Sequence, residues 1–193
     1  GASKARFSTE PTVCACGAMP KPCSSSLFNA FAPTDFGCVM GVPPAGMDIR
    51  SHPFVENPIV AIAPVDHPLV GKKRIPLARL ATEPFLLREP GSGTRMASER
   101  FLKSHGIRLN MRMELGSNEA IKEAVAGGLG LSVISSHALA AKPQSQGLAV
   151  LNVRGFPLHS QWHLVCPKAK RLSPLALAFQ AHLMKVDGEV PRR

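Results

Sequence analysis

Residues 85–95 read FLLREPGSGTR. The apolar run Phe85-Leu86-Leu87 predicts a short strand that is buried on both faces, as in a parallel sheet. A glycine-rich turn follows at once, and the pattern after it predicts a helix that continues through His105. The order strand, glycine-rich turn, helix is the repeating unit of an α/β protein.

The same alternation continues on both sides of this stretch. Ser117 or Asn118 can cap a helix that ends at Gly127-Gly128, and Ser173-Pro174 begins a last helix. Strands that alternate with helices imply an α/β fold with a mainly parallel sheet. The first forty residues, in contrast, have no sustained period and predict no regular element. Short apolar runs predict further strands at residues 58–63, 112–115, 131–134, 148–151 and 162–166.

The composition is that of a globular protein with one domain or two small lobes. The chain has 193 residues, of which 45% are hydrophobic and 19% charged. Lys and Arg outnumber Asp and Glu by 23 to 13, so the formal net charge is +10 and indicates an anionic partner, either a small metabolite or nucleic acid. The apolar runs are far shorter than the roughly 20 residues that cross a bilayer, so we expect no membrane span.

Neither a secretory signal nor a metal cluster is expected. The first residues lack the charged, apolar and cleavage segments of a signal peptide, so we expect a cytoplasmic protein. The five cysteines, an odd number at irregular spacing, argue against a disulfide framework. Cys14, Cys16 and Cys23 contain no CxxC pair, and no histidine precedes His52, so we expect no metal site.

The glycine-rich turn is the best candidate for a binding site. A turn between a strand and a helix exposes backbone N–H groups, and the helix N-terminus adds roughly half a positive charge, so the position favours an anion. Ser92 and Thr94 can add hydroxyl donors, and Arg95 can bind a phosphate or carboxylate through two parallel hydrogen bonds. Alternatively, Ser92 or Thr94 only caps the helix and Arg95 lies in solvent. The spacing alone leaves both interpretations open, because the turn is neither a Walker loop nor a complete dinucleotide fingerprint.

No residue pattern indicates catalysis. The chain has no GxSxG nucleophile elbow, and nothing in the sequence brings a histidine and a carboxylate to a serine. His67 and His105 have the surroundings of loop or surface residues, and His163, in an apolar strand, those of a core histidine. Glu119 and Glu123 lie four residues apart on a predicted helix, away from its apolar face, which is typical of a solvated face. We therefore expect that the protein is not an enzyme.

Several stretches occur together in one order: GVPP at 41–44, PIVAIAPVDHPL at 58–69, FLLREPGSGTR at 85–95, and SNEAIK at 117–122 followed by GGLG at 127–130. In this combination they resemble the effector-binding domain of LysR-type transcriptional regulators. The resemblance extends from about residue 36 to residue 185. It is most similar to the branch of the family that regulates the RuBisCO and Calvin-cycle operon.

The resemblance implies a two-lobed α/β fold of the periplasmic-binding-protein type (type II), with mainly parallel sheets and an effector between the lobes. Residues 1–63 and 163–193 would form the first lobe, and residues 64–162 the second. The glycine-rich turn would then line the cleft, which favours its interpretation as an anion site. The implied effector is a small anionic, phosphorylated metabolite. The implied effector-binding residues are Glu89, Ser92, Gly93, Thr94, Arg95 and Ser135.

The resemblance also implies partners. The domain would sense its effector to control transcription of carbon-fixation genes, within a homodimer or homotetramer and without a cofactor. Regulators of this family bind DNA through a winged helix-turn-helix. This chain lacks one, so DNA binding would require a part that is missing here. The alternatives are a solute-binding protein of the same fold, a domain used mainly for oligomer assembly, and a small α/β enzyme.

Residues 1 to about 30 depart from the family pattern. The family's first strand, helix and second strand should be amphipathic segments here, whereas this stretch is irregular. One hypothesis is a frame error in the gene or in its recorded sequence. Codons that encode residues 13–23 can, when shifted by two bases, encode text typical of the family's second strand.

Overall fold

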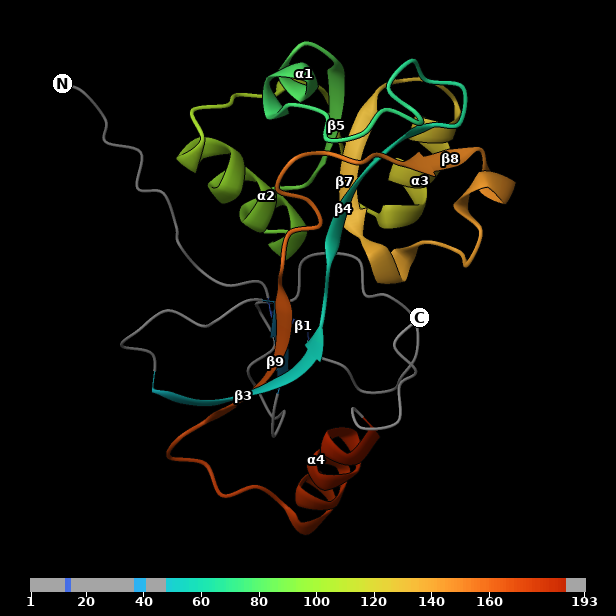
Figure 1. Ribbon diagram of the computed structural model, residues 1–193. Coiled ribbons are helices and arrows are strands. Elements are labelled where there is room, and N and C mark those ends of the chain that lie inside the picture. The colour runs from blue at the N-terminus through green and yellow to red at the C-terminus, as the bar shows by residue number, and fades with distance from the viewer. Residues whose placement is uncertain (1–12, 15–36, 41–47, 187–193) are drawn as a thin grey trace, which may run out of the picture.

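The computed structural model describes residues 13–14, 37–40 and 48–186. Within these residues the chain forms two β-sheets, one in the upper and one in the lower part of Figure 1. Most of the irregular N-terminal stretch, for which we suggested a frame error, lies outside the described residues. The GVPP stretch at residues 41–44 lies outside them too.

The larger sheet has five strands in the order β6-β5-β7-β4-β8. β5 pairs in parallel with β6 and β7, whereas β4 pairs antiparallel with β7 and β8. The strands are β4 (Ile59–Pro64), β5 (Pro84–Arg88), β6 (Asn110–Leu115), β7 (Leu131–Ser135) and β8 (Leu148–Val150). The helices attached to this sheet are α1 (Leu77–Ala81), α2 (Gly93–Ser104), α3 (Asn118–Ala126) and the short 3-10 helices η1 (Ser136–Ala138) and η2 (Pro143–Gln146).

The smaller sheet has four described strands in the order β1-β2-β9-β3, and all its pairings are antiparallel. After β9 the chain continues into α4, at the bottom of Figure 1. None of the described helices is long and apolar enough to span a membrane. The elements are β1 (Val13–Cys14), β2 (Gly37–Met40), β3 (Ile49–Glu56), β9 (Gln161–Pro167) and α4 (Pro174–Val186).

Helices cover both faces of the larger sheet. Alternation along β5 sends Phe85 and Leu87 to one face and Leu86 to the other, and none of the three is more than 4% exposed. The first face packs with α1 through Leu80, and the second with α3 through Ile121. Figure 1 shows α1 and α2 on one side of the strands and α3 on the other. A strand that is buried on both faces is a continuous apolar run in sequence, which is why β4, β5 and β7 were predictable.

The predicted α/β class is confirmed, but the strand pairing is more mixed than the expected mainly parallel sheets. The chain runs through β3 into the larger sheet and returns through β9, so these two neighbouring strands point in opposite directions. β3 itself was not predicted from the sequence. Its residues are exposed or half-buried throughout, so it contains no apolar run.

The chain changes sheet at Asn57 and Pro58, between β3 and β4. We expected residues 59–63 in the first lobe. They instead form β4, which belongs to the larger sheet because it pairs with both β7 and β8. The other lobe boundaries stay predictions.

The expected cap of α3 is confirmed. The Ser117 hydroxyl accepts a hydrogen bond from the backbone N–H of Ala120 at 3.1 Å. At the other end of the helix, Gly128 has a φ of 77° and supplies the left-handed conformation that ends it.

Candidate functional site

The glycine-rich turn connects the end of β5 to the start of α2, as the sequence predicts. Ser92 is the N-cap residue with an extended backbone, and the first helical hydrogen bond runs from the Met96 N–H to the Ser92 carbonyl at 2.9 Å. The backbone N–H groups of Gly93, Thr94 and Arg95 have no acceptor among the described residues. These three donors, at the positive end of a helix of 12 residues, are the groups that bind an anion in other proteins.

The two hydroxyl groups of the turn, on Ser92 and Thr94, also have no hydrogen-bond partner in the described part of the chain. Ser92 is 5% exposed and Thr94 is 3% exposed, yet neither hydroxyl bonds to a described residue. The alternative interpretation, that Ser92 or Thr94 serves only as a helix cap, therefore does not hold, because neither side chain makes a capping hydrogen bond to a described residue. Both hydroxyl groups can donate to a ligand instead.

Gly93 brings the start of α2 against the smaller sheet. A Cβ atom at this position would lie 2.8 Å from the Cβ of Met40, the last residue of β2, and 3.0 Å from its sulfur. Atoms do not approach so closely, so a glycine is required for space rather than for an unusual backbone angle. The turn thus lies where the two sheets meet, which is where the resemblance places the effector.

Arg88 and Glu89 form a bidentate ion pair beside the turn. Nε and Nη2 of Arg88 donate to the two carboxylate oxygens of Glu89 at 2.8 and 2.9 Å. Nη1 of Arg88 donates to the side-chain oxygen of Asn118, the first residue of α3, at 2.7 Å. Arg88 is only 7% exposed, so it fixes the turn to the start of α3 and neutralises the carboxylate of Glu89. The sequence did not predict the bond between Arg88 and Asn118, which are 30 residues apart.

Arg95 is held between carboxylates and is not in solvent. Its Nε donates to Glu99 at 2.8 Å, and its Nη1 donates to Glu114 and to the carbonyl oxygen of Arg88, both at 2.7 Å. Burial lowers the pKa of Arg95, but the hydrogen bonds and charges of Glu99 and Glu114 outweigh it and raise the pKa above its ordinary value. The Nη2 of Arg95 has no acceptor among the described residues, but two parallel hydrogen bonds to an anion would also need Nε or Nη1, which are engaged, so the predicted role of Arg95 stays a prediction.

Ser135 lies at the point where the chain passes between the sheets. Its hydroxyl donates to the side-chain oxygen of Asn57 and accepts from the backbone N–H of His137 at 3.2 Å. The backbone N–H of Asn57 donates to the carbonyl oxygen of Ser160, just before β9, at 2.7 Å. Asn57 is fully buried, and its side-chain nitrogen is sealed from solvent without a partner among the described residues, whereas the unpaired hydroxyls of Ser92 and Thr94 are not sealed from solvent. The sequence indicated Ser135 but gave no sign of Asn57.

The histidines take the non-catalytic places expected for them. His163 is 7% exposed and its Nδ1 lies 3.0 Å from the Ser51 hydroxyl, and burial lowers the pKa of its imidazole. His67 accepts a hydrogen bond from the Leu69 N–H within a loop, and His105 is exposed at the end of α2.

Comparison with known proteins identifies the family. The model of the LysR substrate binding domain matches residues 34–187. A RuBisCO operon transcriptional regulator of Acidithiobacillus ferrooxidans is 49% identical over 153 residues, which cover 78% of this chain and 50% of that protein. The transcriptional activator CmpR of Synechocystis is 48% identical over 151 residues, with the same coverage of 78% and 50%. The chain therefore spans about half the length of these curated relatives.

A solved structure agrees in fold. The regulatory domain of Synechocystis CcmR, determined in complex with 2-PG, superposes with a TM-score of 0.76 and 41% identity, over 82% of this chain and 76% of that chain. The relatives are transcriptional regulators rather than enzymes. From the family match and these identities, we conclude that the chain belongs to the LysR substrate-binding domain family.

Proposed function

We propose that this chain senses a small phosphorylated anion at the start of α2 and so controls transcription of carbon-fixation genes. The observation that carries the proposal is the set of unpaired donors at one place. Three backbone N–H groups and the hydroxyls of Ser92 and Thr94 have no described partner, at the contact between the two sheets. Such a set satisfies the several oxygens of a phosphate or carboxylate.

The relatives support the chemical class of the effector. The CcmR regulatory domain was solved with 2-PG, and RuBisCO operon regulators match over most of this chain. Glu89 does not oppose an anion, because the guanidinium of Arg88 pairs with its carboxylate. We therefore assign Ser92, Gly93 and Thr94 to direct binding, and Arg88 and Glu89 to positioning the turn.

Transmission of the signal requires that the anion bind one arrangement of the lobes better than another. An anion held by α2 of the larger sheet would also lie near Met40 of the smaller one. The two sheets are linked through Asn57, which bonds to both Ser135 and Ser160. A change in the angle between the sheets would then reach the parts of the regulator outside this chain.

We also propose that the domain acts inside the cell as a homodimer or homotetramer. β6 is an edge strand of the larger sheet, and Met111 and Met113 on it are 52% and 39% exposed. An exposed edge strand with apolar side chains favours pairing with another chain. Light scattering after size-exclusion chromatography measures this; a monomer at all concentrations would contradict it.

Calorimetric titration with 2-PG tests the sensing role. We expect binding by the wild-type chain and about tenfold weaker binding by Thr94→Val, which corresponds to the loss of one hydrogen bond to a charged group, about 1.4 kcal/mol. Ser104→Ala is the matched control, because Ser104 lies at the opposite end of α2 and its hydroxyl bonds only to the Phe101 carbonyl and to His105. Equal affinity of Thr94→Val and the wild type would contradict the assignment.

A further inference from the structure

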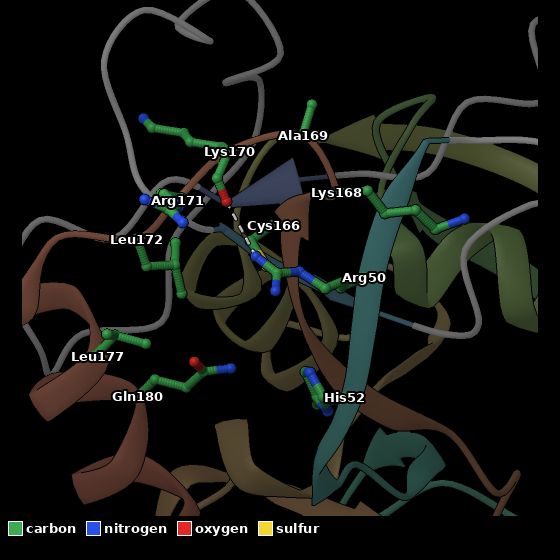
Figure 2. A pocket seen from close by; sticks show the side chains of 10 residues that line it. All are labelled: Arg50, His52, Cys166, Lys168, Ala169, Lys170, Arg171, Leu172, Leu177 and Gln180. Atoms are coloured by element: carbon green, nitrogen blue, oxygen red, sulfur yellow. Dashed lines mark hydrogen bonds between the residues drawn. The ribbon is translucent and has the colours of Figure 1, made fainter.

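A hollow of about 410 Å³ lies against one face of the smaller sheet (Figure 2). No residue of α2 lines it. It is a partly open hollow, bordered by one face of β3 and β9, by the segment 168–172 and by α4. No residue of the predicted effector site lines it. The volume is within the range of cavities that bind small molecules, roughly 300–1,000 Å³.

The register of β3 and β9 explains which side chains face the hollow. Arg50 pairs directly with Cys166, so these two residues lie on the same face of the sheet, together with His52 two residues further along β3. The intervening Ser51 points to the opposite face, where its hydroxyl meets His163. The alternation along two strands therefore brings a guanidinium and an imidazole to the same side of the sheet, under α4.

Arg50 is an exposed residue of β3 and has no carboxylate partner among the described residues, in contrast to the buried Arg88 and the half-buried Arg95. Arg88 and Arg95 are both paired with glutamates. Arg50 instead donates one bond, from Nη2 to the carbonyl oxygen of Lys170 at 3.0 Å, and forms no ion pair with any described residue. Figure 2 shows its guanidinium reaching into the middle of the hollow. Most of its donors are therefore available to a ligand.

The other residues that line the hollow also favour a negatively charged ligand. Arg171 contributes a second guanidinium, and no Asp or Glu is found among the described residues that line the hollow. Lys168 is 4.0 Å from Asp48, with both side chains largely exposed, so this pair offsets little of the positive charge. His52 and Gln180 lie at the other end of the hollow in Figure 2 and can bond to polar groups of a ligand.

We propose that this hollow is a second anion site, which takes a small phosphate ester through the guanidinium of Arg50. Guanidinium groups match phosphate oxygens with parallel hydrogen bonds, and a concave positive site raises the local concentration of anions. The positively charged side chains surround a hollow and do not form a flat stripe along the surface. This shape favours a small molecule over the backbone of a nucleic acid. The site lies on β3 and β9, the strands through which the chain enters and leaves the larger sheet. A ligand bound there would therefore contact the two strands that connect the two sheets.

Titration of the ¹⁵N-labelled full chain with inorganic phosphate, at constant ionic strength, tests the proposal. We expect the side-chain amide signal of Gln180 to shift and saturate. Arg50→Gln should weaken this binding at least tenfold, and Arg171→Gln, which leaves the bond between Arg50 and Lys170 intact, should weaken it several-fold. Arg108→Gln removes the same charge at an exposed position outside the hollow and should leave it unchanged.

Several results would overturn the proposal. One is a Gln180 signal that does not move at saturating phosphate; another is equal weakening by Arg50→Gln and Arg108→Gln, which would reflect only the overall charge. A shift of Gln180 by a DNA duplex that phosphate does not displace would identify a nucleic acid surface instead. The backbone signals of Gly93 and Thr94 report on the α2 site in the same spectra, so failure of one site is distinguishable from failure of the other.

Discussion

Replacing Gly93 with alanine perturbs the contact between the two sheets directly. The added methyl would lie 2.8 Å from the Met40 Cβ, 3.0 Å from its sulfur and 3.3 Å from its Cγ. Because the nearest atom is a Cβ rather than the end of a flexible side chain, rotation of Met40 does not relieve the clash. Overpacking of this kind costs about 1–3 kcal/mol. A contact of 2.8 Å with a Cβ belongs in the upper part of this range, about 2–3 kcal/mol. Alanine regains about 1 kcal/mol of helix propensity, so we expect a net loss of about 1–2 kcal/mol.

Thermal unfolding followed by circular dichroism measures this effect. For a chain of this size each kcal/mol corresponds to about 2–4 °C, so Gly93→Ala should lower Tm by about 2–8 °C. Gly116→Ala is the matched control, because Gly116 has open space where its Cβ would be and no positive φ. The control should change the free energy of unfolding by less than about 0.5 kcal/mol.

The same variant also tests the binding site. If the start of α2 packs on β2, then Gly93→Ala moves the two sheets apart and weakens 2-PG binding together with stability. A Gly93→Ala chain that is as stable as the wild type, or more stable, would refute the reasoning. It would mean that α2 does not pack against Met40 and that the turn does not lie between the sheets.

Three further predictions concern the buried polar groups. Arg88→Met leaves the carboxylate of Glu89 without its partner and should lower the free energy of unfolding, measured in urea, by about 3 kcal/mol. A decrease of less than about 1 kcal/mol would contradict a buried ion pair. Ser135→Ala leaves the side-chain oxygen of Asn57 unpaired and should cost about 1–3 kcal/mol by the same assay, whereas an unchanged midpoint would argue against this bond. Burial lowers the pKa of His163 in the folded chain, so on acidification the unfolded chain binds the proton at a higher pH than the folded chain does. The free energy of unfolding should therefore fall as the pH is lowered from about 7 through the pKa of the unfolded chain, about 6.5. It should level off below the pKa of the folded chain. His163→Gln should flatten that slope between pH 7.5 and 5.5; an identical slope would assign it to other groups.

The elements of the larger sheet were predictable because burial leaves a mark on the sequence. β5 and β7 are buried along most or all of their length and are therefore continuous apolar runs. The turn before α2 was recognisable from its glycines, and Ser117 from its place before an amphipathic helix. β3 was missed because its residues are largely exposed and its position depends on pairing with β9, more than 100 residues later in the chain.

The site was predictable only where its residues are neighbours in sequence. Ser92, Gly93 and Thr94 form one turn, so the pattern of donors is visible without a structure. The contact of Gly93 with Met40 depends on how the two sheets pack. The bond between Arg88 and Asn118 depends on the end of β5 lying beside the start of α3. Arg95 and Glu99 are four residues apart on α2, so their ion pair follows from the helical spacing. The ion pair of Arg95 with Glu114 arises from tertiary structure, and no local pattern indicates it.

Backbone amide signals of the ¹⁵N-labelled chain during titration with 2-PG test the central claim most directly. We predict that the largest shifts occur at Gly93, Thr94 and Arg95, the three N–H groups without an acceptor at the start of α2. Sulfate at the same ionic strength should produce smaller shifts at these positions. Saturable binding of 2-PG that leaves these three signals unmoved would contradict the claim that this turn is the effector site.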